Sequence, residues 1–377
     1  MPSTANDKVF HRTELAERIA DQVLGPYGAS GVFIAAPRRT GKSTLLVEDM
    51  LPCLKKKACE VIYVDLWDDC KLDAGELIAE TLREYLRSRE SVLLKWARKG
   101  GLEKVKLAGQ ELDIDKVGIG RSKTYSRALA ELSDATRRPI VLIIDEVQQA
   151  LTSTIGTATL FALKAARDQL NSSAHHGFRL IATGSNRDKL SLLVHGHDQA
   201  FMNATLVDLE LLGEDYLQWE LARHGDALKP SLPAAMKAFA LAGRQPEILR
   251  KALNDLAFRP RLTARTIDAA LLSAARKIRE SARLEFLGKL TVLPPLQAAV
   301  LGVMAKAGRK YAPFRPHTKA LYEAAIRKLT PEPVNIDDSA VEYALEALRN
   351  KALVWKSAHG VYAIEESQHR TLLARRA

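Results

Sequence analysis

Apolar residues follow two periods over the first 210 residues of the chain. Four short apolar runs predict buried strands at residues 31–36, 61–65, 141–145 and 178–183. Apolar residues at helical spacing predict helices at residues 42–56, 75–99, up to 136 and 160–170. Strands that are separated by helices form parallel sheets with helices on both faces. The pattern therefore predicts an α/β fold with a doubly wound parallel sheet.

The pattern changes twice in the middle of the chain. Residues 105–115 alternate between apolar and polar positions around a glycine, which predicts a hairpin inserted at about 100–122. Residues 214–257 carry three short helical patterns, typical of a small helical lid, and residues 263–290 carry one longer, arginine-rich helix.

The last part of the chain has a third pattern. Helical spacing at residues 296–306, 318–329 and 339–350 is followed by two short apolar strands, 352–356 and 360–364. Three helices and a two-stranded ribbon are typical of a winged helix-turn-helix. The predicted domains are an α/β domain at 1–212, a lid with its connecting helix at 213–290 and a winged-helix domain at 291–377.

Composition indicates a folded protein outside membranes. The chain has 377 residues, of which 47% are hydrophobic, enough for two or three domains with cores. Its first 15 residues have no apolar signal region, and no apolar stretch approaches the ~20 residues that span a bilayer. We therefore expect a cytoplasmic location and no membrane partner. The three cysteines, Cys53, Cys59 and Cys70, lack zinc-site spacing and argue against a disulfide framework.

Positive charge is concentrated in the C-terminal third. Residues 258–377 contain 21 Lys and Arg against 11 Asp and Glu, a net charge of +10, whereas the whole chain carries +11. A localised excess of this kind is expected of a surface that binds a phosphate backbone, although a solvated cationic face has the same composition.

The most informative chemistry lies in the sequence IAAPRRTGKST at residues 34–44, which joins the first strand to a helix. Backbone N–H groups of such a loop surround a triphosphate, Lys42 reaches the outer phosphates and Ser43 ligates Mg²⁺. The loop residues expected to contact ATP are Ala36, Pro37, Arg38, Arg39, Thr40, Gly41, Lys42, Ser43 and Thr44.

A second motif completes the triphosphate site. The sequence VLIIDE at residues 141–146 is an apolar strand that ends in two carboxylates. We expect Asp145 to hold Mg²⁺ and Glu146 to orient and activate the attacking water. The usual loop begins with glycine where this chain has Ala36, which is tolerated if the backbone there has a negative φ. A chance match to a short pattern is the alternative.

With these motifs in hand, the chain resembles the AAA+ superfamily, in the branch of archaeal-type, origin-recognition and STAND signalling ATPases. Residues 36–44 and 141–146 are similar to its Walker A and Walker B motifs, and residues 10–15 (FHRTEL) to its F-x-R-x-E-L block. Residues 178–186 end in GSN, similar to the sensor 1 strand, and residues 243–246 (GRQP) are similar to the lid motif.

The resemblance implies further site residues. Arg12 would lie against the nucleotide base, and Ser185 and Asn186 would face the γ-phosphate or the attacking water. Arg244 would be the sensor 2-like cation, next to Pro246 of the lid motif. Each has a structural alternative: Arg12 a surface arginine, Asn186 a helix cap and Arg244 a helix-end charge. Arg187 is the one candidate offered for an arginine finger acting on a neighbouring subunit.

The C-terminal domain is less clearly suited to reading DNA. Its third helix, which would enter the major groove, carries Glu342 and Glu346. We therefore expect residues 258–377 to track the phosphate backbone of duplex DNA with little sequence preference. Docking of a protein partner is the competing use of this domain.

Two functions remain. The first is an ATP-hydrolysing molecular switch or machine, slow or partner-stimulated, that acts with DNA and self-associates in the ATP state. The second is a STAND-like signalling ATPase whose C-terminal domain docks a protein partner. A small-molecule kinase fits less well, because the paired acids and the GSN block followed by a lid suit hydrolysis.

Overall fold

The computed structural model describes eleven stretches of the chain. Asn186 and nearly all of the hairpin insertion predicted at 100–122 lie outside them, as do Cys70 and the end of the helix predicted to reach residue 99. The described residues are 8–69, 71–89, 122–172, 174–185, 187–195, 200–223, 229–259, 262–351, 353–358, 361–364 and 370–376.

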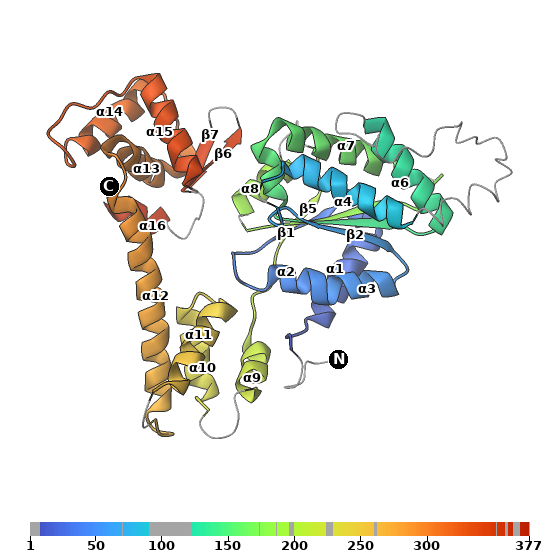
Figure 1. The fold of residues 1–377 in the computed structure, drawn as a ribbon, viewed down its shortest axis with the longest axis horizontal. Coiled ribbons are helices and arrows are strands. Elements are labelled where there is room, and N and C mark those ends of the chain that lie inside the picture. The colour runs from blue at the N-terminus through green and yellow to red at the C-terminus, as the bar shows by residue number, and fades with distance from the viewer. Residues whose placement is uncertain are drawn as a thin grey trace. The chain divides into compact units, whose positions relative to one another are not determined.

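A parallel sheet with the strand order β2-β3-β4-β1-β5 forms the centre of the first domain (Figure 1). The predicted doubly wound α/β fold is confirmed. The fifth strand was not predicted, because its four residues lie at the sheet edge, are half-buried or exposed and lack an apolar run. The strands are β1 (Val32–Ala35), β2 (Glu60–Asp65), β3 (Ile140–Asp145), β4 (Phe178–Gly184) and β5 (Thr205–Asp208).

Helices cover both faces of this sheet because successive side chains of each strand point to opposite faces. Val141 and Ile143 of β3 share a core with α1, α3 and the residues Leu45–Met50 before α3, whereas Ile140, Leu142 and Ile144 share a core with α4, α6, α7 and α8 (Figure 1). The helices are α1 (Thr13–Leu24), α2 (Lys42–Thr44), α3 (Leu51–Lys56), α4 (Ala74–Ser88), α6 (Ser122–Thr136), α7 (Thr154–Leu170) and α8 (Arg187–His195).

The helical stretch after the phosphate loop is not regular. Between α2 and α3 the residues Leu45–Met50 form a π-helical turn. Pro52 follows at once, and a proline has no N–H to donate to the preceding turn. The sequence pattern predicted one continuous helix at 42–56, and the wider turn within it appears only in the structure.

Three helices form the lid, as predicted. They are α9 (Glu214–Ala222), α10 (Leu232–Leu241) and α11 (Pro246–Ala257). An aromatic cluster joins the lid to the N-terminal segment: Phe10 lies 5.5 Å from Tyr216 and 5.6 Å from Trp219 between ring centroids. The lid therefore packs on the residues that precede α1.

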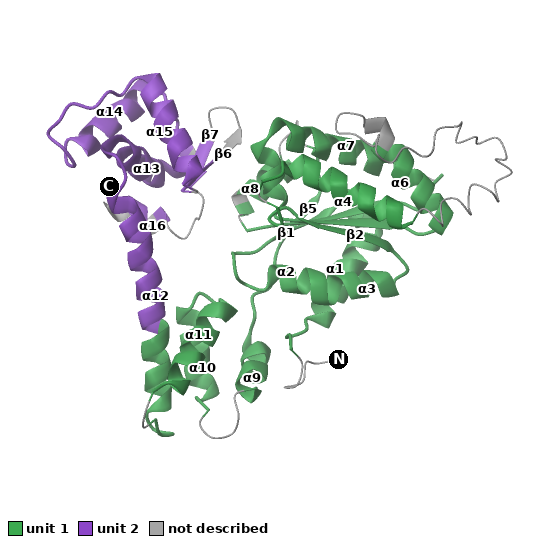
Figure 2. Cartoon of the chain, in the orientation of Figure 1, with its two compact units in different colours: residues 1–275 green, residues 276–377 purple. Residues whose placement is uncertain are grey.

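The chain divides into two compact units, residues 1–275 and 276–377 (Figure 2). The division falls inside α12 (Ile267–Thr291), the predicted connecting helix. The three-domain division remains a prediction. No helix within the described ranges is both long and apolar enough to cross a membrane.

Unit 2 has the predicted winged-helix elements around one core. Val300, Tyr322, Leu345 and Leu348 are among its buried residues. A C-terminal helix, α16, was not predicted. The elements are α13 (Pro295–Ala307), α14 (Pro316–Ile326), α15 (Asp338–Asn350), β6 (Val354–Ala358), β7 (Val361–Ile364) and α16 (Arg370–Arg376).

Truncating the core of unit 2 tests this packing. Leu345 is fully buried, so Leu345→Ala should lower the free energy of unfolding by about 2–5 kcal/mol. Leu321 on α14 is 44% exposed and serves as a matched control. Leu321→Ala should change the free energy of unfolding by less than about 0.5 kcal/mol. Urea denaturation followed by tryptophan fluorescence measures both. Equal losses in the two variants would contradict this core.

Candidate nucleotide-binding site

The phosphate loop connects the carboxyl end of β1 to α2. Gly41 has a φ of 87° at the position before α2, and Thr40 Oγ1 donates to the Pro37 carbonyl at 2.7 Å inside the loop. Ala36 is buried, donates its N–H to the Gly184 carbonyl at 3.1 Å and is not among the described residues with positive φ. Its alanine is therefore compatible with the loop, as expected.

The functional side chains of the two motifs meet where β1 and β3 end. Lys42 Nζ forms an ion pair with Glu146 and lies 3.3 Å from Asp145 Oδ1. Ser43 Oγ donates to Asp145 Oδ2 at 2.6 Å. Lys42, Asp145 and Glu146 are exposed by only 7%, 1% and 9%, so one buried cation is paired with two buried carboxylates.

Neighbouring strands and loops hold the two acids in place. Thr183 of β4 donates to Asp145, and Gln148 Nε2 donates to Glu146 Oε2. The backbone N–H of Ser185 reaches the same Glu146 oxygen at 3.2 Å. Glu146 itself has a left-handed backbone, with φ 57° and ψ 42°, which turns its side chain back towards β4.

Gly184 makes this arrangement possible. A Cβ atom at this position would lie 2.5 Å from Gln148 Oε1 and 2.8 Å from Leu190 Cδ2. The glycine of the GSN block therefore leaves room for Gln148, which is 3% exposed and donates to Glu146; a larger residue would displace that side chain.

A cavity of about 440 Å³ opens onto these acids. Arg38 stacks on one wall of it, with its Cζ 5.2 Å from the centroid of the Trp67 ring. The lining residues are Pro37, Arg38, Arg39, Gly41, Lys42, Ser43, Thr44, Asp65, Trp67, Asp145 and Glu146.

Asp65 is a lining residue that the sequence interpretation missed. It ends β2 in register with Asp145 of β3, and its Oδ1 accepts the N–H of Trp67 at 2.9 Å. Burial raises the pKa of Asp65, and the negative charges of Asp145 and Glu146 raise it further. An apolar strand ending in an acid, the signal that identified Asp145, is present at residues 61–65 as well.

A second cavity of about 470 Å³ shares Arg39, Gly41 and Thr44 with the first, so the two are neighbours along the phosphate loop. Arg12 and Pro246, both predicted site residues, line it. Its apolar walls include Val9, Phe10, Leu45, Leu212 and Tyr216. The other lining residues are Lys8, Arg39, Gly41, Thr44, Glu247, Arg250, Lys251 and Asn254.

The structure brings Arg250, and not Arg244, to this cavity. Arg244 is exposed, has a φ of 55° in the turn between α10 and α11, and lines neither cavity. Arg250 lies about one helical turn into α11 and lines the second cavity. The sequence interpretation selected Arg244 because it lies inside the glycine–proline motif. The sequence carries no signal for which face of the next helix, α11, lines the cavity. The role of Arg244 stays a prediction.

Arg12 is held between two anchors. Its backbone N–H donates to Asp49 Oδ2 at 2.9 Å, and its guanidinium donates to the Glu210 carbonyl. Asp49 belongs to the π-helical turn, and its other oxygen contacts His11 Nδ1 at 2.8 Å. Burial lowers the pKa of Arg12.

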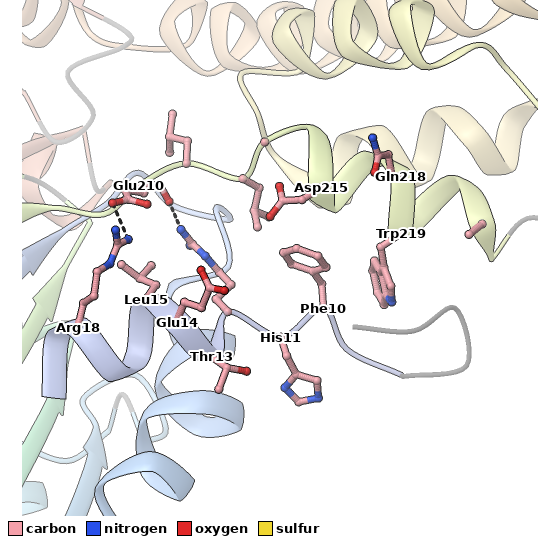
Figure 3. A pocket seen from close by; sticks show the side chains of 15 residues that line it. Phe10, His11, Thr13, Glu14, Leu15, Arg18, Glu210, Asp215, Gln218 and Trp219 are labelled. Carbon is pink, nitrogen blue, oxygen red and sulfur yellow. Dashed lines mark hydrogen bonds and ion pairs between the residues drawn. The ribbon is translucent and has the colours of Figure 1, made fainter. Parts of the chain in front are cut away.

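On the far side of this segment lies a cavity of about 740 Å³, where Phe10 and Trp219 face each other and Arg18 pairs with Glu210 at 2.8 Å (Figure 3). It shares Phe10, Arg12 and Leu212 with the second cavity. Arg12 thus lines both cavities, and its place beside the nucleotide base stays a prediction.

Arg187, the candidate arginine finger, begins α8 and forms an ion pair with Asp208 at the end of β5. Asn186 lies outside the described residues. The roles of both remain predictions.

Comparison with known proteins identifies the fold. The ADP form of the Aeropyrum pernix ORC2 protein matches with a TM-score of 0.53 and 15% identity, over 97% of this chain and 92% of that chain. This chain has the ORC2 fold. The predicted resemblance to origin-recognition ATPases is confirmed at the level of fold, including the lid and the winged helix.

Two other solved structures match over similar lengths. The Aeropyrum pernix ORC1 protein in complex with DNA has 15% identity and a TM-score of 0.47, over 98% of this chain and 93% of that chain. The Pyrobaculum aerophilum Cdc6p has 13% identity and a TM-score of 0.43, over 100% and 97%. No protein-family model and no curated protein matches the chain.

The cation of the site provides its first test. Lys42→Ala should weaken ATP binding by about 10- to 100-fold, since a hydrogen bond to a charged group contributes about 1.5–3 kcal/mol. Lys57→Ala is the control, because Lys57 pairs with the exposed Asp21 outside both cavities and should bind ATP normally. Calorimetry measures both affinities. Unchanged affinity in Lys42→Ala would refute the site.

Proposed function

We propose that this ORC2-fold chain binds ATP with Mg²⁺, hydrolyses it slowly or upon stimulation by a partner, and acts with duplex DNA as a molecular switch. The observation that carries the proposal is the meeting of Lys42 and Ser43 with Asp145 and Glu146 beside two adjacent cavities. One cavity has the acids and the cation suited to a triphosphate. The other has apolar walls suited to a base and also holds the lid cation Arg250, beside the phosphate-loop residues that both cavities share.

The residues fit a magnesium ion. Ser43 Oγ and Asp145 Oδ2 lie 2.6 Å apart at the start of the helical stretch, and both are hard oxygen ligands. Such a pair takes one or two positions of an octahedral ion, which leaves the others to phosphates and water. When bound, Mg²⁺ neutralises charge on the outer phosphates.

Hydrolysis is proposed to depend on exchange of partners at Lys42. A triphosphate offers Lys42 a stronger anionic partner than Glu146, because phosphate oxygens carry more charge. Glu146, released from the cation and oriented by Gln148 and the Ser185 N–H, can then accept a proton from water. Glu146 is thereby the proposed base, with Asn186 completing the site.

Arg250 is the proposed cation for the outer phosphates from the lid, alongside the predicted Arg244. A lid arginine of this kind responds to the γ-phosphate, so lid position and self-association are proposed to follow the nucleotide. Arg187 remains the proposed contact to a neighbouring subunit.

The proposed DNA-binding region is the basic residues 258–377. Arg276, Lys277 and Arg279 are exposed on α12, and Lys310 and Arg315 are exposed between α13 and α14. Exposed cations on several elements favour contacts with phosphates over contacts with bases.

One observation favours the alternative, a STAND-like ATPase that docks a protein. Tyr343 on α15 is 76% exposed and lies between the exposed Glu342 and Glu346. Exposed tyrosines are enriched in protein interfaces, whereas carboxylates on this helix repel DNA.

Hydrolysis is tested at Glu146. Glu146→Gln should keep ATP affinity within about threefold and lower turnover about 100-fold or more, since it removes the base and preserves the side-chain size. Phosphate release and calorimetry measure the two quantities. Turnover equal to that of the wild type would exclude Glu146 as the base.

Because Glu146→Gln holds ATP without consuming it, the same variant tests assembly. Light scattering should show a larger mass with ATP and Mg²⁺ than with ADP. A single monomer mass in both states would contradict self-association and leave the hydrolysis result standing.

DNA binding is tested by its salt dependence. The double variant Lys310→Ala, Arg315→Ala should lower the slope of log affinity against log salt by about 0.9 for each phosphate contact removed. Fluorescence anisotropy with duplexes of two unrelated sequences, over a salt series, measures the slope. Lys55→Ala, Lys56→Ala removes two exposed charges from α3 of unit 1 and is the matched control.

Glu342→Ala extends the DNA experiment to α15 and should leave affinity unchanged or raise it, since it removes a repulsive charge. Absence of wild-type binding at low salt with ATP, with ADP and without nucleotide would favour the protein-docking alternative.

A further inference from the structure

Arg250 of the lid is held by a carboxylate whose role the phosphate-loop motifs do not explain. Its Nε donates to Glu220 Oε2 at 2.9 Å, which joins α11 to α9. Glu220 is 3% exposed, and the same oxygen accepts the Tyr216 hydroxyl at 3.0 Å. A buried carboxylate of the lid helix α9 thus pairs with an arginine of the lid helix α11, and that arginine lines the second cavity.

An indole ring supports the same guanidinium. Arg250 Cζ lies 5.9 Å from the centroid of the Trp219 ring, within the range of a cation–π contact. Trp219 is buried and packs on Phe10 of the segment that lines the cavity. Arg250 is therefore held by an ion pair and a ring from α9.

The geometry leaves Arg250 able to bind an anion. A guanidinium has five N–H donors, so a bond at Nε leaves others to form a forked contact with phosphate oxygens. A free arginine would lose rotamer freedom on binding a phosphate, at a cost of about 0.5–1.5 kcal/mol, and a side chain already held avoids much of that loss.

The lid also reaches the phosphate loop directly. Arg39 Nη1 of the loop lies 3.3 Å from Glu247 Oε2 of α11, one turn before Arg250. Both residues line the cavity that shares Arg39, Gly41 and Thr44 with the phosphate side. The face of α11 that carries Arg250 is therefore the face next to the phosphate loop.

We propose that Glu220 is a positioning residue that holds Arg250 ready for the outer phosphates and so sets the preference of the site for ATP over ADP. This inference rests on the proposed ATP-binding function. Glu220 acts through Arg250 alone, without contacting the nucleotide itself.

The experiment compares ATP and ADP affinity, each with Mg²⁺, in full-length chains that all carry Glu146→Gln so that ATP persists. Glu220→Gln keeps the size of the side chain and removes its charge. It should lower the ratio of ATP to ADP affinity by about 2- to 10-fold, with ADP affinity nearly unchanged. Arg250→Ala should lower the ratio by about 10- to 100-fold.

A matched control separates positioning from lid stability. Asp255→Asn, also in the lid, breaks the 2.6 Å pair with Arg259 outside both cavities and should leave the ratio unchanged. In the double variant Glu220→Gln, Arg250→Ala, the loss of Glu220 should add nothing to the loss of Arg250, because it acts through that residue.

Three results would overturn the inference: an unchanged or raised ATP preference in Glu220→Gln, equal losses of ATP and ADP affinity, or a full additional loss in the double variant. A failure of the proposed function is distinct, since the chain with Glu146→Gln alone would then bind no ATP. If Glu220→Gln does not fold, Glu220→Asp replaces it, because it keeps the charge and shortens the side chain. Its ratio of ATP to ADP affinity should lie between that of the chain with Glu146→Gln alone and that of the Arg250→Ala variant.

Discussion

The site depends on one cation shared by two buried carboxylates. Asp145 ends a strand in which all six residues are buried, Glu146 follows it, and Lys42 is the charge that pairs with both. Buried carboxylates without a partner are costly, so the loop that carries Lys42 must close on the end of β3. In the proposed function, the same closure supplies the cation that an incoming phosphate would take from Glu146, so one contact would serve both the stability of the fold and the binding of a triphosphate.

The parallel sheet makes this contact geometrically available. All five strands run in the same direction, so the loop after β1, the acids of β2 and β3 and the polar end of β4 lie at one edge. The helices on both faces leave this edge open, as in other doubly wound sheets. At this edge the small residue Gly184 leaves room for Gln148 to reach Glu146.

The lid adds a second set of charges to the same loop. Glu247 approaches Arg39, and Glu220 holds Arg250, so two acids of the lid orient two arginines around one cavity. Lys251 and, more weakly, Arg39 lower the pKa of Glu247, which keeps it charged at neutral pH. In the proposed function, nucleotide phosphates would compete for these arginines, and the lid would therefore respond to the nucleotide that is bound.

The sequence by itself determined the doubly wound fold, the winged-helix elements and the Lys42, Ser43, Asp145 and Glu146 group, because apolar periodicity and short contiguous motifs are local signals. It missed β5, whose edge position needs no apolar run, and the π-helical turn before Pro52. Only the tertiary structure brought Asp65 and Arg250 to the cavities and joined Glu220 to Arg250. Those contacts depend on strand register and on which face of a lid helix meets the core, and neither is encoded in the spacing of residues along the chain.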